Sequence, residues 1–362
     1  MMLHEMRNAT LSDNSLLREG LRELRRRLPP GWSASELTSE PRTSIALAAD
    51  ATTELSAPNG RTGTITFEAR ARLDPKAVRP LVDKLRLSGV GLQGAFVVVA
   101  RYLGESTRGR LRDADVGYLD LTGNARIVVA DPGLFIETQG ASEDPDREER
   151  PARSLRGAKA GRIVRALIDR REPPGVRELA ILTKMNAGYV SRVLALLDTE
   201  ALVTRVGHGR LESVDWPALL RRWTQDAPLE SRGAIGTYLE PRGLSALVAR
   251  LAKSDERYAV TGALAAAALA PTAPPRLATI WIRDAVAAAT RLGLRPAEAG
   301  ANVMLIEPAD EEVFEGAAQR DGVWYAAPSQ VATDLLTSPG RGPAEGEELI
   351  TWMQGNEEKW RR

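Results

Sequence analysis

Apolar residues recur at helical spacing in the middle of the chain. Val190, Val193, Leu194 and Leu197 follow the i, i+3, i+4, i+7 pattern of one helix face. This spacing predicts a helix over residues 189–202. Its apolar face needs a partner, so the neighbouring segments decide what kind of module it belongs to.

Two further helices are predicted before this one. The first covers 157–172 and is ended by Pro173-Pro174, and the second covers 175–183. Beyond the third helix, residues 203–216 are typical of two short strands around a Gly207-His208-Gly209 turn. The residues predicted to face inward are Ile163, Val164, Leu167 and Ile168 in the first helix and Val176, Leu179 and Ala180 in the second.

The N-terminal part alternates helical and strand patterns. Leucines at helical spacing predict a helix from Leu16 to Leu28. The later elements are expected as strands over 43–50 and 63–73, a helix over 77–88, a strand over 94–103, a helix over 106–117, and one or two strands over 118–139. An Asn59-Gly60 turn is expected before the second strand. Strands that alternate with helices indicate an α/β layer.

The C-terminal part shows a similar alternation. A strand and then a helix of small residues are predicted over 256–271, with Thr261-Gly262 at their junction. A buried strand over 276–284, a helix over 284–294 and a buried strand over 301–308 follow. The pattern is β-α-β-α-β, which again indicates an α/β layer.

Polar, proline-bearing segments divide these parts. Residues 141–153 are expected to be a linker, and a second break is expected near 224–233. The predicted division is therefore an α/β domain over 1–142, a winged helix-turn-helix over 154–224 and an α/β domain over 233–362. The fold class expected for the whole chain is α/β multidomain, with the helical module in the middle. Its length of 362 residues fits two or three domains.

The composition excludes several classes of site. The chain has no cysteine, which excludes disulfides, thiolate zinc sites and cysteine nucleophiles, and His4 and His208 are its two histidines. We therefore expect no metal and no cofactor. Neither an apolar run of membrane-spanning length nor a signal-like N-terminus is present in the sequence, so a cytoplasmic, nucleoid-associated protein without membrane contact is expected.

The overall charge of +1 hides a strong local asymmetry. Residues 153–224 carry fourteen Lys and Arg against seven Asp and Glu, a local charge of +7. Residues 235–362 carry thirteen against seventeen, a local charge of −4. A basic centre beside a mildly acidic part indicates that the centre meets a polyanion, although basic helices are also common on ordinary protein surfaces.

The central pattern of three helices and a hairpin resembles the bacterial winged helix-turn-helix family. Ala180 is a small residue at the expected helix crossing, and Tyr-Val-Ser-Arg opens the third helix. The resemblance implies that the third helix enters the major groove of double-stranded DNA. The expected base contacts are Asn186, Tyr189, Ser191 and Arg192, and the expected wing and phosphate contacts are Lys159, Arg162, Lys184, Arg205, His208 and Arg210. A winged helix used for protein contacts alone is the alternative.

The N-terminal element order resembles the PD-(D/E)xK nuclease fold, the restriction-endonuclease-like class. Asp50 ends one expected strand, and Glu68-Ala69-Arg70 lies in the next. Acidic groups on neighbouring strands can hold Mg²⁺, and a lysine can orient the attacking water. Here Arg70 stands where the pattern has lysine, and arginine stays protonated. We expect a nuclease-like scaffold without nuclease activity, and therefore no catalytic residues. The alternative is a solvent-facing Asp and Glu on an edge of the sheet.

Residues 157–362 resemble the abortive-infection type IV antitoxins, the AbiEi family. The shared features are the Val-Thr-Gly before a helix at 260–262 and the segment 326–336. The resemblance implies a regulator that represses its own promoter and contacts a toxin or other protein through its C-terminal domain. This chain departs from the pattern by its additional N-terminal domain. In the segment 326–336, Ser329 is expected to be a helix N-cap, and Pro328 and Gln330 are expected to be structural.

Asp120 is unusual because it lies in an apolar strand before a Gly-Asn turn. It is expected either to pair with an arginine such as Arg101 or to cap the turn. Three functions remain open: a DNA-binding regulator, expected as a homodimer, a metal-dependent nuclease delivered to DNA, and a DNA-bound scaffold for another protein.

Overall fold

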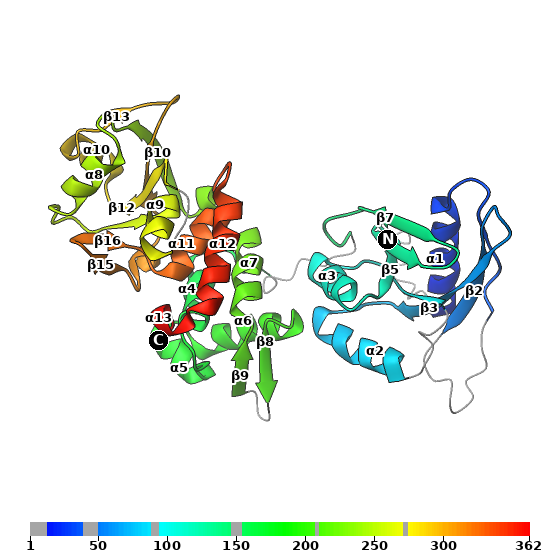
Figure 1. The fold of residues 1–362 in the computed structure, drawn as a ribbon. Coiled ribbons are helices and arrows are strands. Elements are labelled where there is room, and N and C mark those ends of the chain that lie inside the picture. The colour runs from blue at the N-terminus through cyan, green and yellow to red at the C-terminus, as the bar shows by residue number, and fades with distance from the viewer. Residues whose placement is uncertain (1–12, 39–49, 88–93, 146–153, 207–209, 271–273) are drawn as a thin grey trace, which may run out of the picture. The chain divides into compact units, whose positions relative to one another are not determined.

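The chain forms two compact units (Figure 1). In this computed structural model the described residues are 13–38, 50–87, 94–145, 154–206, 210–270 and 274–362. One unit comprises residues 1–149 with 199–201, and the other comprises residues 150–198 with 202–362. The main boundary falls inside the segment 141–153 that the sequence marks as a linker. None of the helices in the described ranges is long and apolar enough to span a membrane.

The first unit is a seven-stranded mixed sheet with helices on both faces. Its strands lie in the order β1 to β7, with β3, β4 and β5 parallel and their outer neighbours antiparallel. The elements are α1 (Asp13–Arg27), β1 (Ser33–Ala34), β2 (Ala51–Ser56), β3 (Thr62–Arg70), α2 (Pro75–Leu87), β4 (Gly94–Ala100), α3 (Glu105–Asp113), β5 (Gly117–Asp120), β6 (Ala125–Val129) and β7 (Leu134–Thr138).

Strand β4 shows why this sheet needs two helical layers. Val97 and Val99 pack with α1 on one face, and Val98 and Ala100 pack with α2 and α3 on the other. Alternate residues of a strand point to opposite faces, so a continuous apolar run is buried only when both faces are covered.

Most expected elements of this unit are present, with two differences. The strand expected over 43–50 lies outside the described residues apart from Asp50, and the described strand β2 follows it. Residues 118–139 contain parts of three strands where one or two were expected. The Asn59-Gly60 turn is confirmed, because Gly60 has a φ of 80° and the Arg61 N–H donates to Asn59 Oδ1 at 3.0 Å.

The second unit begins with the helices and hairpin expected between 157 and 216. These are α4 (Ala158–Ile168), α5 (Val176–Thr183), α6 (Ala187–Thr199), β8 (Val203–Val206) and β9 (Arg210–Val214), followed by α7 (Trp216–Asp226) and the short turn η3 (Leu229–Ser231). The break expected at 224–233 does not divide the molecule. A single hydrophobic cluster runs from Leu155 through Trp223 to Met353.

A second seven-stranded mixed sheet forms the rest of this unit. Its strand order is β13-β10-β14-β12-β11-β16-β15. Its elements are β10 (Gly233–Leu239), α8 (Leu244–Leu251), β11 (Tyr258–Thr261), α9 (Gly262–Leu269), β12 (Ala278–Ile282), α10 (Ala285–Arg291), β13 (Arg295–Pro296), β14 (Val303–Pro308), η4 (Glu311–Phe314), β15 (Ala318–Arg320), β16 (Val323–Tyr325), α11 (Pro328–Leu336), α12 (Gly342–Gly355) and α13 (Glu357–Trp360). The β-α-β-α-β order expected from 258 to 308 is present.

Helix α11 carries a buried carboxylate that fastens it to the sheet. The Asp334 side chain accepts hydrogen bonds from Arg232 at 2.6 Å, Thr261 at 2.6 Å, Trp281 at 2.7 Å and Gln330 at 2.8 Å. A buried carboxylate is tolerated when its oxygens are fully hydrogen-bonded and paired with a cation. Asp334 meets both conditions.

The expected N-cap of this helix was wrong. Helix α11 begins at Pro328, so Ser329 lies inside its first turn and its hydroxyl is buried without a hydrogen-bond partner. Proline is favoured at the first helical position because its missing N–H would have no intrahelical acceptor there. The proline therefore sets the start of the helix two residues earlier than a Ser329 N-cap predicts, with Ala327 as the N-cap.

Candidate nucleic-acid interface

The turn between α5 and α6 is short and closed by the backbone. Lys184 has a φ of 56°, in the left-handed region, and its N–H donates to Ile181 O at 3.2 Å. The next N–H, of Met185, donates to Ala180 O at 3.0 Å, and the Asn186 Oδ1 accepts from Tyr189 N at 2.7 Å. The Asn186 side chain therefore caps α6, and its oxygen is already used within the protein.

Helix α6 has one buried face and one exposed face. The four residues predicted to face inward are buried. Ser191 and Arg192 are exposed on the opposite side, whereas Tyr189 is half-buried. The Arg192 guanidinium lies 5.8 Å from the centre of the Tyr189 ring, and burial raises the pKa of the Tyr189 hydroxyl. The aromatic ring thus supports an arginine at the exposed start of the helix.

The β8–β9 hairpin follows directly and adds two cations. Arg210 is exposed at the start of β9. Arg205 is half-buried beside a register shift in the hairpin, and its Nε and Nη2 are buried without a hydrogen-bond partner among the residues that the structure describes. His208 lies outside the described residues. A guanidinium with unused donors is costly to bury, so Arg205 has hydrogen-bonding capacity to offer a ligand.

Helix α4 divides its cations between surface and interior. Lys159 is exposed in the first turn. Arg162, expected to contact phosphate, instead directs Nη2 at both carboxylate oxygens of Asp310, at 2.8 and 2.7 Å. Arg165 is 3% exposed and donates to Gln330 Oε1 at 2.7 Å and Glu315 O at 2.7 Å. Two of the three cations of α4 are therefore turned inward.

The remaining cations are free to meet an anion. No ion pair joins Lys159, Lys184, Arg192 or Arg210 to an acidic residue in the described part of the chain. These side chains come from the start of α4, the α5–α6 turn, the start of α6 and the hairpin. The two lysines offer compact point charges for phosphate, and the two arginines offer planar guanidinium groups, of which that of Arg192 lies on the exposed face of α6.

A second cluster in the first unit surrounds Glu68 on β3. Glu68 is buried, and Arg70 Nη2 contacts its Oε1, while Arg70 Nη1 donates to Ala69 O at 2.8 Å. Asp50 Oδ2 accepts from the Ala69 N–H at 2.9 Å. The structure thus brings the expected residues Asp50, Glu68 and Arg70 together at the C-terminal end of β3. Since β3 lies between β2 and β4 and Glu68 is buried, the alternative of a solvent-facing Glu on a sheet edge was wrong.

Lys84 joins this cluster from helix α2. Its Nζ lies 3.5 Å from Glu68 Oε1. Burial raises the pKa of Glu68, the nearby Asp50 raises it further, and Arg70 and Lys84 oppose the rise. The lysine missing beside Glu68 in sequence is thus present in space. Among the residues that the structure describes, no three His, Cys, Asp or Glu side chains are grouped so that they could hold a metal ion.

Asp120 caps the turn that follows it. Its Oδ1 accepts from Thr122 N at 2.9 Å and Asn124 N at 3.0 Å, and its Oδ2 accepts from Leu103 N at 3.0 Å. Asn124 also donates through Nδ2 at 2.9 Å. These bonds confirm the capping interpretation and leave the carboxylate fully used.

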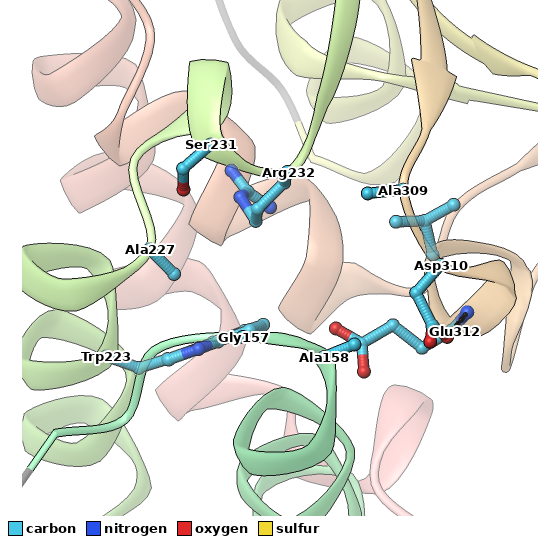
Figure 2. A pocket seen from close by; sticks show the side chains of 10 residues that line it. Gly157, Ala158, Trp223, Ala227, Ser231, Arg232, Ala309, Asp310 and Glu312 are labelled. Carbon is cyan, nitrogen blue, oxygen red and sulfur yellow. Dashed lines mark hydrogen bonds between the residues drawn. The ribbon is translucent and has the colours of Figure 1, made fainter. Parts of the chain in front are cut away.

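Sequence reasoning missed a pocket beside the N-terminus of α4. Figure 2 shows Trp223, Arg232 and Glu312 around it. Gly161 is the local signal: a Cβ there would lie 2.5 Å from Glu312 Oε1, so the helix needs glycine at this point. The signal was not usable in advance because Glu312 is more than a hundred residues away in the chain.

Comparisons with protein-family models, with curated proteins and with solved structures found no match for this chain. The geometry of its own residues is therefore the basis for a functional proposal.

Proposed function

We propose that α4, α5, α6 and the β8–β9 hairpin form a winged helix-turn-helix that binds specific double-stranded DNA. The observation that carries this proposal is the set of unpaired cations around the exposed start of α6. An α-helix fits the major groove, and residues at its N-terminal end reach base edges. The protein would then act as a transcriptional regulator.

The residues divide into two roles within this proposal. Arg192 and Ser191 are placed to read bases, because they are exposed on α6 and an arginine fork matches the two acceptors of guanine. Lys184, Arg210 and Lys159 are placed to meet phosphates, which gives affinity without sequence information. Arg162 is left out because Asp310 holds its guanidinium.

The test is a binding-site selection followed by gel-shift titrations of the selected DNA. Arg192→Ala should weaken binding and relax sequence preference by about 1–3 kcal/mol at one base pair. Arg295→Ala is the matched control, because Arg295 is also exposed but lies on β13 of the sheet. It should leave both quantities unchanged. Equal affinity and equal preference for wild type and Arg192→Ala would rule out base reading by this residue.

An antitoxin-like autorepressor is the narrower form of the same proposal. In this form, the protein binds DNA upstream of its own gene as a homodimer. The homodimer occupies two half-sites whose centres lie about 34–36 Å apart along the duplex. Footprinting on that upstream DNA tests it. A single protected half-site, or protection absent from this region, would leave regulation of other genes as the role.

We further propose that the first unit is a nuclease-like scaffold without nuclease activity. Arg70 contacts both the Glu68 carboxylate and the Ala69 carbonyl, which are the oxygens that a divalent cation would need at this edge. A fixed guanidinium there excludes the cation by charge and by space. Lys84 adds a second positive charge at the same Glu68 oxygen, with its Nζ 3.5 Å from Oε1.

A further inference from the structure

A small pocket of the second unit lies between the start of α4, the end of α7, the segment from η3 to β10, and the segment from β14 through η4. Its walls include Ala158 at the start of α4, Trp223 from α7, Arg232 after η3, and Glu312 from η4 (Figure 2). The cavity volume is about 60 Å³. A cavity of about 150 Å³ holds benzene, and a water needs roughly 10–15 Å³, so this pocket fits a molecule of a few heavy atoms.

Three polar groups of the pocket are buried without a partner. Trp223 is 1% exposed and Glu312 is 7% exposed, and neither Trp223 Nε1 nor Glu312 Oε2 has a hydrogen bond in the described part of the chain. Arg232 Nε is also buried without a hydrogen-bond partner there, although Nη1 of the same guanidinium pairs with Asp334. Unpaired buried polar groups are rare and costly, and three around one cavity indicate a ligand.

Most of the available groups are donors. Trp223 Nε1 and Arg232 Nε each present an N–H. The N-terminus of α4 borders the pocket at Gly157 and Ala158, and Gly157 offers no side-chain cap. The first N–H groups of a helix have no intrahelical acceptor and carry a partial positive charge. Two of the three unpaired side-chain groups are therefore donors, and the third is the Glu312 Oε2.

Glu312 and Asp310 are the carboxyl groups of the pocket that could oppose an anion. Arg162 Nη2 holds both oxygens of Asp310, at 2.8 and 2.7 Å, so the charge of Glu312 depends on its own surroundings. It faces Arg165 and Arg162 of α4, and Asp310 and Glu315 of its own segment. Burial is the main cause that raises its pKa to about 7. At neutral pH about half of the molecules therefore carry a protonated Glu312, which is itself a donor.

We propose that this pocket binds a small monocarboxylate of the size of formate or acetate. Its two oxygens would accept from Trp223 Nε1, Arg232 Nε and the N-terminus of α4, and one of them would share the proton of Glu312. A carboxylate supplies several acceptor sites in a few atoms, which matches both the volume and the unpaired donors. Binding would couple to uptake of one proton above pH 7.

The experiment is isothermal titration of the full chain with sodium acetate at constant ionic strength, with sodium chloride and acetamide as matched probes. Acetate should bind about tenfold more weakly at pH 8 than at pH 6, because Glu312 is largely protonated only at the lower pH. Chloride and acetamide should bind at least tenfold more weakly than acetate at pH 6.

Two variants separate the pocket from other anion sites. Glu312→Gln should keep acetate binding but lose its pH dependence, since an amide donates at every pH. Trp223→Phe removes one N–H and should weaken binding about tenfold at pH 6, whereas Trp324→Phe, at an exposed site on β16, should not. Matching circular dichroism spectra check that each variant is folded.

Three outcomes would overturn the proposal: heats for acetate no larger than for chloride, acetamide binding as tightly as acetate, or the same pH dependence in Glu312→Gln. None of these measurements contains DNA, so the result is independent of the proposed regulator function.

Discussion

At the residue scale, Glu312 shows how burial changes the chemistry of an ordinary carboxyl group. Its pKa rises from 4.5 to about 7 because the charged form loses its water. The folded protein therefore holds this proton more tightly than the unfolded chain does. The contribution to stability is complete below about pH 4.5 and is lost as the pH rises to about 7.

Replacing Glu312 by Gln should remove this decrease in the free energy of unfolding, because an amide does not titrate. At pH 8 the variant should be more stable than wild type by up to about 3 kcal/mol, and at pH 4 it should differ little. Urea unfolding at both pH values measures the difference. Glu348→Gln, at an exposed position of α12, is the control and should change neither value. A stability gain that is equal at pH 4 and pH 8 would contradict burial of a titrating group.

Arg70 is a second residue whose position decides chemistry. Because its guanidinium contacts the Glu68 carboxylate and the Ala69 carbonyl, we expect no cleavage of plasmid DNA by the purified protein with Mg²⁺ or Mn²⁺. Agarose gels after long incubation measure this. Metal-dependent cleavage that disappears in Glu68→Ala would show that the cluster is a working nuclease site.

At the element scale, the α5–α6 turn contains a residue, Lys184, that has a strained backbone conformation and is also proposed to contact phosphate. Lys184 adopts a left-handed conformation that glycine adopts without cost. Lys184→Gly should therefore raise the free energy of unfolding by about 1 kcal/mol. The same change should weaken DNA binding and reduce its salt dependence by about one phosphate contact.

A second variant separates the two effects. Lys184→Ala removes the same charge but keeps a side chain at the strained position. It should weaken DNA binding equally without the gain in stability. Thermal unfolding and gel shifts at several salt concentrations measure both. A stabilised glycine variant with unchanged DNA affinity would exclude Lys184 from the interface.

At the scale of the whole molecule, the second unit has one core. Leu155 and Met353 belong to the same hydrophobic cluster, Arg162 of α4 binds Asp310 at the start of η4, and Arg165 of α4 binds Gln330 in α11. The helical module is therefore built into this unit.

This arrangement predicts that residues 150–362 fold by themselves. The fragment should unfold in a single cooperative transition and keep the DNA affinity of the full chain. Calorimetry and gel shifts measure the two properties. A fragment of residues 154–224 is the comparison, and it should be much less stable because it lacks η4 and α11, which pack against α4 and α7 and bind Arg165. An equally stable short fragment would show that the module is independent.

The sequence by itself determined the local elements. The four inward residues of α6 are buried because apolar spacing of 3.6 residues leaves one helix face to pack. The Asn59-Gly60 turn and the Asp120 cap also follow from neighbours within a few residues. Such features depend on backbone geometry and short-range hydrogen bonds, which sequence spacing fixes directly.

The tertiary structure alone decided which charged groups are free. Arg162 meets Asp310, Arg165 meets Gln330, and Lys84 reaches Glu68, although these partners are far apart in sequence or lie on different elements. Long side chains pair with the groups that the fold brings within a few ångströms. The number of charged residues in a segment does not show where each side chain points. For this reason the basic centre was visible in the sequence, whereas its division into exposed and buried cations, and the pocket beside them, came from the packing of α4 against α7, η4 and α11.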